Sequence, residues 1–366
     1  MSTLLTSTPR QDGFRMPGEF EQHDGCWMLW PERPDTFRMG AKPAQKAYAE
    51  TAVAISQFER VTVGVSAAQF KNARNQLPAH IRVIEISYND AWIRDTGPIF
   101  VNNGQAVRAV DFDFNAWGGL NGGLYFPWDQ DELVARKVAE IEWLDRYKAP
   151  LILEGGAITV DGAGTLITTA QCVLNSNRNP QLSKTETESY LQDYLGLEKI
   201  IWLPRGSEED ETDGHVDGLC AFIRPGEVVL SWTDDKGDPQ HEISQEALEI
   251  LQNTTDAQGR KLKIHKIYNP SPIYVTAAES SGIDIVDGTL PRPEGKCMGG
   301  SYVNFYMANG GLVATTYNDP ADAPALAALQ TLLPERKVVG VPSREIFLGG
   351  GMVHCITQQQ PSAKSK

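Results

Sequence analysis

The chain has few cysteines, and none of them forms a recognisable pair. Its five cysteines are an odd number, lie far apart and include no Cys-x-x-Cys motif: Cys26, Cys172, Cys220, Cys297 and Cys355. This pattern predicts neither a disulfide framework nor a zinc knuckle. Each thiol is therefore interpreted singly, and all except Cys355 are expected to be small buried hydrophobes.

The sequence also lacks an excess of basic residues, a long apolar run and a secretory leader. Acidic residues outnumber basic ones 47 to 33, which argues against nucleic acid or an anionic membrane as a partner. No apolar stretch approaches the length of a membrane span, and the opening MSTLLTSTPRQDGF does not follow the pattern of a signal peptide. We therefore expect a cytoplasmic protein. The negative charge would suit a cationic small molecule, although solubility alone also accounts for it.

Short β-hairpins recur along the chain, each with a glycine-containing turn between two apolar or alternating runs. They are PIFVNNGQAVRAVDF, AITVDGAGTLITTA, LCAFIRPGEVVLSW and NFYMANGGLVATTY. Asn-Gly, Asp-Gly and Pro-Gly turns provide the tight corners that such loops need. Helical patterning lies between the hairpins, and the N-terminal stretch can supply a fifth unit. This self-similarity predicts a propeller-like assembly around one central pocket, while two ordinary α/β domains fit the pattern equally well.

A cluster of polar residues precedes most of these hairpins. Asp95 lies in NDAWIRDTGP, Glu154 in LILEGGAITV, and both His215 and Asp217 in DETDGHVDGLCAF. Glu154 follows Asp95 by 59 residues and His215 follows Glu154 by 61, which indicates equivalent places in successive units. The last cluster, GGGMVHCITQQQP, contains Cys355. If the units surround one axis, these side chains converge.

Together these clusters provide a thiol, an imidazole and several carboxylates. A metal site is not expected, because the chain has no HExxH or paired-cysteine spacing and only one convincing histidine. A cysteine nucleophile must become a thiolate, and neighbouring carboxylates oppose that unless a cation lies among them. A guanidinium group is such a cation, and carboxylates bind it in bidentate fashion. The residues therefore favour hydrolysis of a C–N bond in a guanidine.

Five motifs of the sequence resemble those of a known enzyme family. NDAWIRDTGP, FNAWGGL, LEGGAITVDG, DGHVDG and GGGMVHCITQQQP together resemble the agmatine deiminases of the guanidine-modifying superfamily, over nearly the whole chain. The resemblance implies a single catalytic domain over residues 1–366, an α/β five-bladed pseudo-symmetric propeller of ββαβ units with the active site on its axis. It also implies conversion of agmatine and water to N-carbamoylputrescine and ammonia, with no cofactor or metal, by a homo-oligomer.

The resemblance assigns a role to each residue of the clusters. It implies that Cys355 is the nucleophile and His215 the general acid and base, while Asp95 and Asp217 clamp the guanidinium. Glu154 would orient either the guanidinium or His215. The alternatives left open are an arginine or peptidyl-arginine deiminase, and a non-catalytic polyamine binder.

Other residues carry weaker expectations. Trp92 is expected to pack near the guanidinium plane or the aliphatic stem. Glu211, in the acidic run SEEDETDGH, is the candidate contact for the substrate amine, although such a run is also typical of a solvated loop. His354 adjoins Cys355, but adjacent side chains diverge in an extended segment, so His215 is preferred as the acid and base. Met352 departs from the family pattern, which usually has asparagine there.

Overall fold

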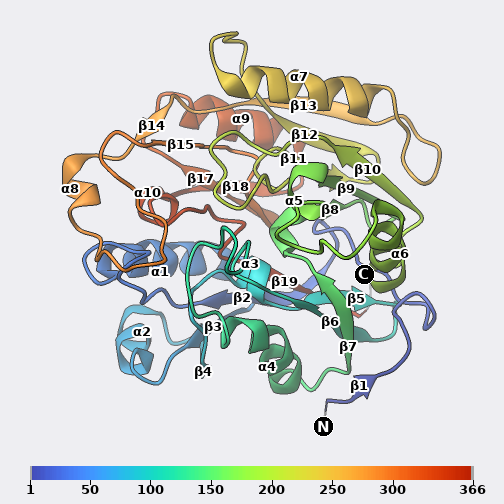
Figure 1. The fold of residues 1–366 in the computed structure, drawn as a ribbon, viewed down its shortest axis with the longest axis horizontal. Helices are drawn as coiled ribbons and strands as arrows, with labels where there is room; N and C mark the ends of the chain where they lie inside the picture. The colour runs from blue at the N-terminus through green and yellow to red at the C-terminus, as the bar shows by residue number, and fades with distance from the viewer. Residues whose placement is uncertain (1, 364–366) are drawn as a thin grey trace.

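The computed structural model describes residues 2–363, and its fold is mixed α/β, built from several small sheets (Figure 1). The hairpins predicted from turn chemistry are confirmed as antiparallel strand pairs. In chain order these strands are β5 (Ile99–Asn102) with β6 (Val107–Asp113), β8 (Ile158–Val160) with β9 (Thr165–Thr169), β11 (Cys220–Arg224) with β12 (Glu227–Trp232), and β16 (Tyr306–Ala308) with β17 (Gly311–Thr316).

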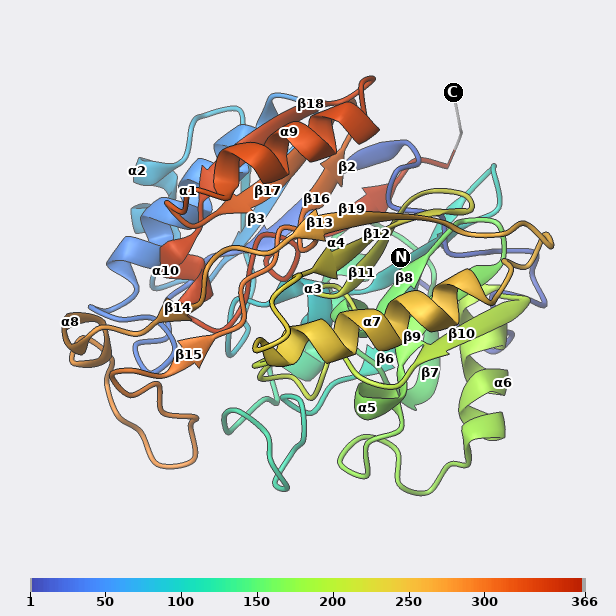
Figure 2. The ribbon, with the colours of Figure 1, turned by 90° about the horizontal axis from the view of Figure 1, so that it is seen from above.

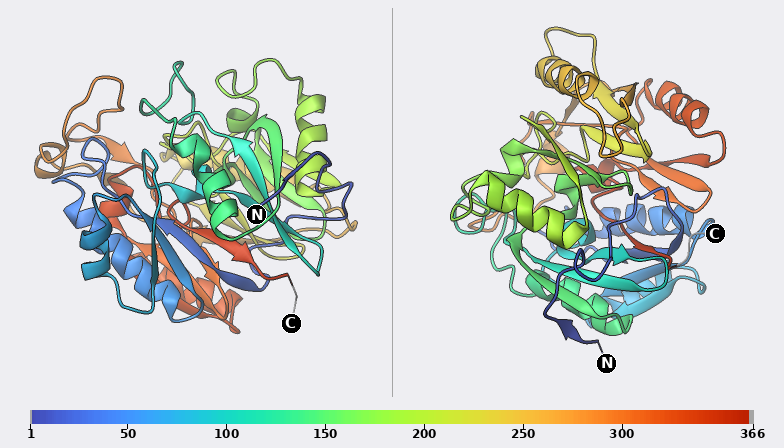
Figure 3. Two further views of the ribbon diagram at one scale, coloured as in Figure 1. Left: turned by 90° about the horizontal axis from the view of Figure 1, so that it is seen from below. Right: turned by 90° about the vertical axis from the view of Figure 1, so that its right-hand side faces the viewer.

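Each hairpin continues through a helix into a third strand that runs parallel to the second. The helices are α4 (Val134–Ile141), α6 (Lys184–Leu195), α7 (Pro239–Gln252) and α9 (Asp322–Leu332). The third strands are β7 (Arg146–Ile152), β10 (Lys199–Leu203), β13 (Lys263–Tyr268) and β18 (Lys337–Pro342). A parallel strand needs such a crossover, so the repeated order is ββαβ. Figures 2 and 3 show the long helices at the periphery and the strands toward the middle.

A further sheet joins the two ends of the chain. Strand β2 (His23–Leu29) runs parallel to β3 (Val61–Val65), and helix α1 (Lys42–Ser56) connects them. After α2 (Phe70–Gln76), strand β4 (Arg82–Glu85) extends the sheet. On its other side, β19 (Gln358–Pro361), from the C-terminal segment, pairs antiparallel with β2. The N-terminal stretch does supply a fifth unit, but one of its strands comes from the far end of the chain.

The remaining elements are short. They are β1 (Leu4–Leu5) beside β7, the pair β14 (Ile273–Tyr274) and β15 (Cys297–Met298), the 3-10 helices η1 (Asp131–Leu133) and η2 (Gly155–Ala157), and the helices α3 (Ile93–Thr96), α5 (Ala170–Val173), α8 (Ala277–Ser280) and α10 (Arg344–Phe347). Two of them, α3 and η2, directly precede the hairpin strands β5 and β8 and contain residues of the predicted clusters. They therefore position site residues.

Local sequence explains where these elements begin and end. Helix α6, for example, starts at a capping box in which Ser183 and Glu186 each accept a hydrogen bond from the other's backbone N–H, and it ends at Gly196 with φ of 66°. Such a cap contributes about 1 kcal/mol. Between sheets and helices the core is apolar and includes fully buried Trp27 and Trp232. Within residues 2–363 there is no helix with the length and apolar character needed to span a membrane.

Candidate active site

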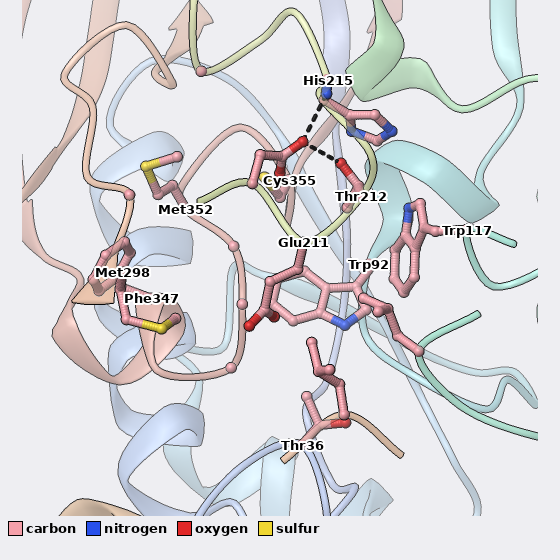
Figure 4. Close-up of a pocket in the computed structure, with 18 of the residues that line it drawn as sticks. Thr36, Trp92, Trp117, Glu211, Thr212, His215, Met298, Phe347, Met352 and Cys355 are labelled. Atoms are coloured by element: carbon pink, nitrogen blue, oxygen red, sulfur yellow. Dashed lines mark hydrogen bonds between the residues drawn. The ribbon is translucent and has the colours of Figure 1, made fainter. Parts of the chain in front are cut away.

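One cavity gathers residues from segments far apart in the sequence. Its lining includes Trp92, Asp95, His215, Asp217 and Cys355, which the sequence placed in separate clusters. Figure 4 shows Cys355 and His215 at one end of this cavity and Thr36 at the other, with Trp92 between them. The convergence predicted from the spacing of the clusters is therefore present in the structure.

The Cys355 thiol lies against carboxylate and amide groups. Its Sγ is 3.8 Å from Oδ2 of Asp217 and 3.5 Å from Nδ2 of Asn304. Burial, followed by the charges of Asp217 and Asp95, raises the pKa of Cys355 well above its ordinary value. Gly351 fits in the turn beside the thiol because a Cβ there would lie 2.5 Å from the Trp92 ring. Without a cation in the cavity, Cys355 is thus a neutral thiol.

His215 lies between two carboxylates. Its Nδ1 is 4.0 Å from Oδ2 of Asp95, and its Nε2 is 3.8 Å from Oε2 of Glu154. Burial would lower the pKa of His215, but the charge of Asp95 and the contacts with Cys172 and Glu154 together raise it well above the ordinary value. Its backbone N–H donates to Oδ2 of Asp210, which also accepts from the Thr212 hydroxyl (Figure 4). The imidazole is held as a cation that can donate a proton.

Asp95, on helix α3, is fixed by two donors. The backbone N–H of Gly156 donates to Oδ1 at 2.8 Å, and Nε1 of Trp117 donates to Oδ2 at 3.0 Å. Burial raises the pKa of Asp95 to about 6, although the charge of His215 opposes this. Gly156 is required at this close approach, because a Cβ there would lie 2.4 Å from Nδ1 of His215.

Asp217 is held by a histidine on its other side. Nδ1 of His354 lies 2.8 Å from Oδ2 of Asp217, and Nε2 of His354 lies 2.9 Å from Oε2 of Glu19. Burial would raise the pKa of Asp217, but the hydrogen bond and the charge of His354 lower it overall. Asp217 therefore faces the thiol as a carboxylate.

Glu154 contacts His215 from outside the cavity lining. Nε of Arg178 donates to its Oε1 at 2.6 Å, and both side chains are 1% exposed. Burial would raise the pKa of Glu154, but mainly the charge of Arg178 lowers it to about 2. Glu154, Cys172 and His215 have atoms close enough to hold a metal ion. The permanent cation of Arg178 already occupies this corner, 3.9 Å from Sγ of Cys172, so the donor set does not suit a metal.

The two residues predicted to bind the rest of the substrate both line the cavity. Trp92 stacks on Phe37 with ring centroids 5.6 Å apart and donates through Nε1 to Oδ2 of Asp90 at 3.0 Å. Glu211 forms ion pairs with Arg292, at 2.5 Å, and with Lys296. Trp92 therefore presents a fixed wall. The charge of Glu211 is already matched by two cations.

Met352 also lies at the cavity, where the family pattern differs from this chain. Its Sδ accepts a hydrogen bond from the Tyr317 hydroxyl at 2.9 Å. It lines the cavity with Met298 and Phe347, which gives this end an apolar wall (Figure 4). The Met352 side chain thus packs against Tyr317 and forms part of the cavity wall.

Several residues of the site were not found from the sequence. Glu19, Arg178 and Asn304 act as partners of the predicted residues, but none stands in a motif whose spacing indicates chemistry. Trp117 stands in the motif FNAWGGL, but the motif indicated no role for it. Glu19 lies in MPGEFEQHDG, where a single acid among polar residues is common. Only the long-range packing of the chain brings these partners to the residues that they contact.

Comparison with known proteins gives matches over essentially the full chain. A family model for Porphyromonas-type peptidyl-arginine deiminase matches residues 15–361. The chain is 58% identical to a putative agmatine deiminase of Latilactobacillus sakei, covering 100% of both chains, and 58% identical to agmatine deiminase of Pseudomonas aeruginosa, covering 98% of both. The solved structure of agmatine deiminase of Enterococcus faecalis is similar with a TM-score of 0.96 and 51% identity, over 99% of this chain and 100% of that one.

Proposed function

The chain belongs to the Porphyromonas-type peptidyl-arginine deiminase family, and from this premise we propose that it hydrolyses agmatine to N-carbamoylputrescine and ammonia. The resemblance to agmatine deiminases stated from the motifs is confirmed by relatives of that name at 58% identity over full length. Agmatine is a small cation with a guanidinium at one end and a primary amine at the other.

The observation that carries the proposal is the charge around the thiol. Asp95 and Asp217 both line the cavity with Cys355, and both oppose its ionisation. A thiol kept neutral by carboxylates becomes nucleophilic when a cation binds between them, because the cation stabilises the thiolate. The guanidinium of the substrate supplies that charge, so binding and activation are the same event.

The proposed reaction has two halves. The Cys355 thiol releases its proton to solvent as the guanidinium binds, and Asp95 and Asp217 hold the guanidinium while the thiolate attacks its central carbon and forms the S–C bond. His215 donates its proton to the departing nitrogen, which leaves as ammonia, and an amidino-cysteine remains. A water then loses a proton to His215 and adds to the same carbon. As the S–C bond breaks, the added hydroxyl becomes the carbonyl of the ureido product, and its proton passes to the departing sulfur, which restores the neutral thiol.

Glu154 acts in this scheme through His215. Its carboxylate, 3.8 Å from Nε2, favours the cationic imidazole that the first half needs. Its ion pair with Arg178 fixes the carboxylate in that place. The Trp92 ring is proposed to pack against the guanidinium or the aliphatic stem. Glu211 remains a proposed contact for the amine, in competition with its own two cations.

We also propose that the repeated ββαβ sheets are the blades of one five-bladed propeller, and that residues 1–366 form one catalytic domain. A hydrogen bond between the first strands of neighbouring hairpins supports this arrangement: the N–H of Phe222 on β11 donates to Oγ1 of Thr159 on β8, at 3.1 Å. A cytoplasmic, homo-oligomeric enzyme remains part of the same proposal.

A substrate panel tests the function. We expect ammonia release from agmatine, and turnover of free arginine and of a C-terminal-arginine peptide lower by at least about a hundredfold, because a buried site made for one end group rejects another. Cys355→Ala should abolish release while leaving the circular dichroism spectrum unchanged. Preferred turnover of arginine or of the peptide would replace agmatine as the substrate, and binding of agmatine without turnover would favour a polyamine binder.

A further inference from the structure

The imidazole of His354, the residue that precedes Cys355, lies between two carboxylates. Nδ1 of His354 is 2.8 Å from Asp217 and Nε2 is 2.9 Å from Glu19. Ionised carboxylates only accept hydrogen bonds, so both ring nitrogens must donate and the ring must carry a proton on each. The contacts therefore describe a carboxylate–imidazolium–carboxylate chain that ends at Sγ of Cys355.

The surroundings of this chain keep each member in place. His354 is 7% exposed and its backbone N–H donates to Oδ1 of Asn304 at 2.9 Å, the same side chain that contacts Cys355. Oε1 of Glu19 accepts from the backbone N–H of Met307 at 2.9 Å. Glu19 therefore has one oxygen committed to the backbone and the other to the imidazolium.

Arg94 is the other charged group that faces His354. Its Nε donates to the His354 carbonyl at 3.2 Å, and its Nη2 lies 3.8 Å from Oε2 of Glu19. Burial and the charge of Arg94 would lower the pKa of His354, but Glu19 and Asp217 raise it overall. Glu19 thus offsets a neighbouring cation that would otherwise oppose the imidazolium.

The carboxylate–imidazolium–carboxylate contacts also link two cavities. Asp217 lines both the cavity that contains Cys355 and a second cavity, which is further lined by Glu19, Arg94 and His354. Asp217 can be held from this second side without any obstruction of the space where the substrate binds. This is the arrangement expected of groups that orient a clamp and do not touch the substrate.

We propose that Glu19 and His354 are positioning residues, which hold the Asp217 carboxylate charged and aimed at the guanidinium. The proposal rests on the proposed function, because the clamp matters only if a guanidinium is the substrate. Loss of Glu19 leaves the imidazolium with Arg94 as a neighbour and without its second acceptor. The imidazole then loses its proton more readily, and Asp217 loses a charged partner.

The direct test is Glu19→Gln, which keeps the side-chain volume and removes the charge. We expect the KM for agmatine to rise about tenfold with a smaller change in kcat, because the lost interaction is made to the bound cation in ground and transition states alike. Thermal unfolding should stay near that of the wild type. Glu227→Gln is the matched control, since it removes a carboxylate 3.1 Å from Nε2 of His265 outside the site.

An unchanged KM in folded Glu19→Gln, or an equal effect of Glu227→Gln, would overturn the proposal. A measurement on the wild type covers the case in which the variant does not fold. The ¹⁵N shifts of ¹⁵N-histidine-labelled protein should show His354 with both ring nitrogens protonated at neutral pH, and a neutral ring would contradict the chain of contacts. This readout needs no turnover, so failure of the agmatine assignment remains distinguishable from failure of the positioning role.

Discussion

The charge state of Cys355 links the site to its substrate at the scale of single residues. Its thiol is half-buried and faces Asp217, so the free protein holds it protonated. In many cysteine enzymes a histidine cation next to the sulfur lowers the pKa of the thiol and makes the thiolate available. Here His215 instead contacts Asp95 and Glu154, and the imidazolium of His354 is matched by Asp217 and Glu19. In the proposed mechanism, the cation that activates the thiol therefore arrives with the substrate.

The pH dependence of the reaction tests this account. Asp95 must be ionised to bind a guanidinium, and burial raises its pKa from 3.8 to about 6. The carboxylate is present above that value and is lost as the pH falls through it. We expect kcat/KM for agmatine to fall by up to about tenfold per pH unit below pH 6 in the pH–rate profile.

Asp217 should cause no further decrease of kcat/KM in this pH range, because its pKa is lowered and it stays ionised. A kcat/KM that stays constant from pH 7 down to pH 4.5 in folded protein would contradict the role of Asp95.

Residues of the candidate site could be predicted only where a short motif contained them. Cys355, His215, Asp95 and Asp217 stand in short clusters, and the structure brings all four to one cavity. Glu19 could not be found in this way, because its contact with His354 spans 335 positions. Single charged partners of this kind have no local pattern.

At the scale of elements, short turns fix the positions of the site residues. The 3-10 helix η2 presents the N–H of Gly156 to Asp95 and places its Cα beside the ring of His215. A side chain at position 156 would push the carboxylate of Asp95 and the ring of His215 apart. Glycine is therefore needed at position 156 of the motif LEGGAITV for steric reasons, in addition to its preference for turns.

Gly156→Ala tests that reason. The added Cβ would lie 2.4 Å from Nδ1 of His215, so the ring must move. A displacement of about 1 Å at a catalytic group costs about a hundredfold in rate, and we expect kcat for agmatine to fall by that factor or more. Gly237→Ala is the control, because its Cβ would have no atom closer than 3.3 Å. Equal activity of the two variants would show that the close approach is unimportant.

Elements were predicted well where local sequence decides them. The Gly-containing turns located all four hairpins, since such corners are set by the turn residues themselves. The pairing of β19 with β2 was not predicted, because it joins Gln359 to Cys26 across most of the chain. No local signal specifies which distant edge a strand will meet.

At the scale of the whole molecule, the site depends on nearly the entire chain. Asp95 and Cys355 are 260 residues apart in sequence, yet both contribute to one cavity. Strand β19 begins three residues after Cys355 and pairs with β2, so the sheet that joins the chain ends also anchors the segment that contains Cys355. The net charge of −14 gives the whole protein a field that favours a cationic substrate.

The covalent step is the central claim, and one measurement tests it most directly. Wild-type protein mixed with agmatine is quenched in acid within the first turnover, digested and examined by mass spectrometry. We predict that the peptide containing Cys355 carries the mass of agmatine minus ammonia, and that Cys355→Ala shows no such adduct. An adduct on Cys172 or another cysteine, or agmatine turnover without any adduct on Cys355, would contradict the account.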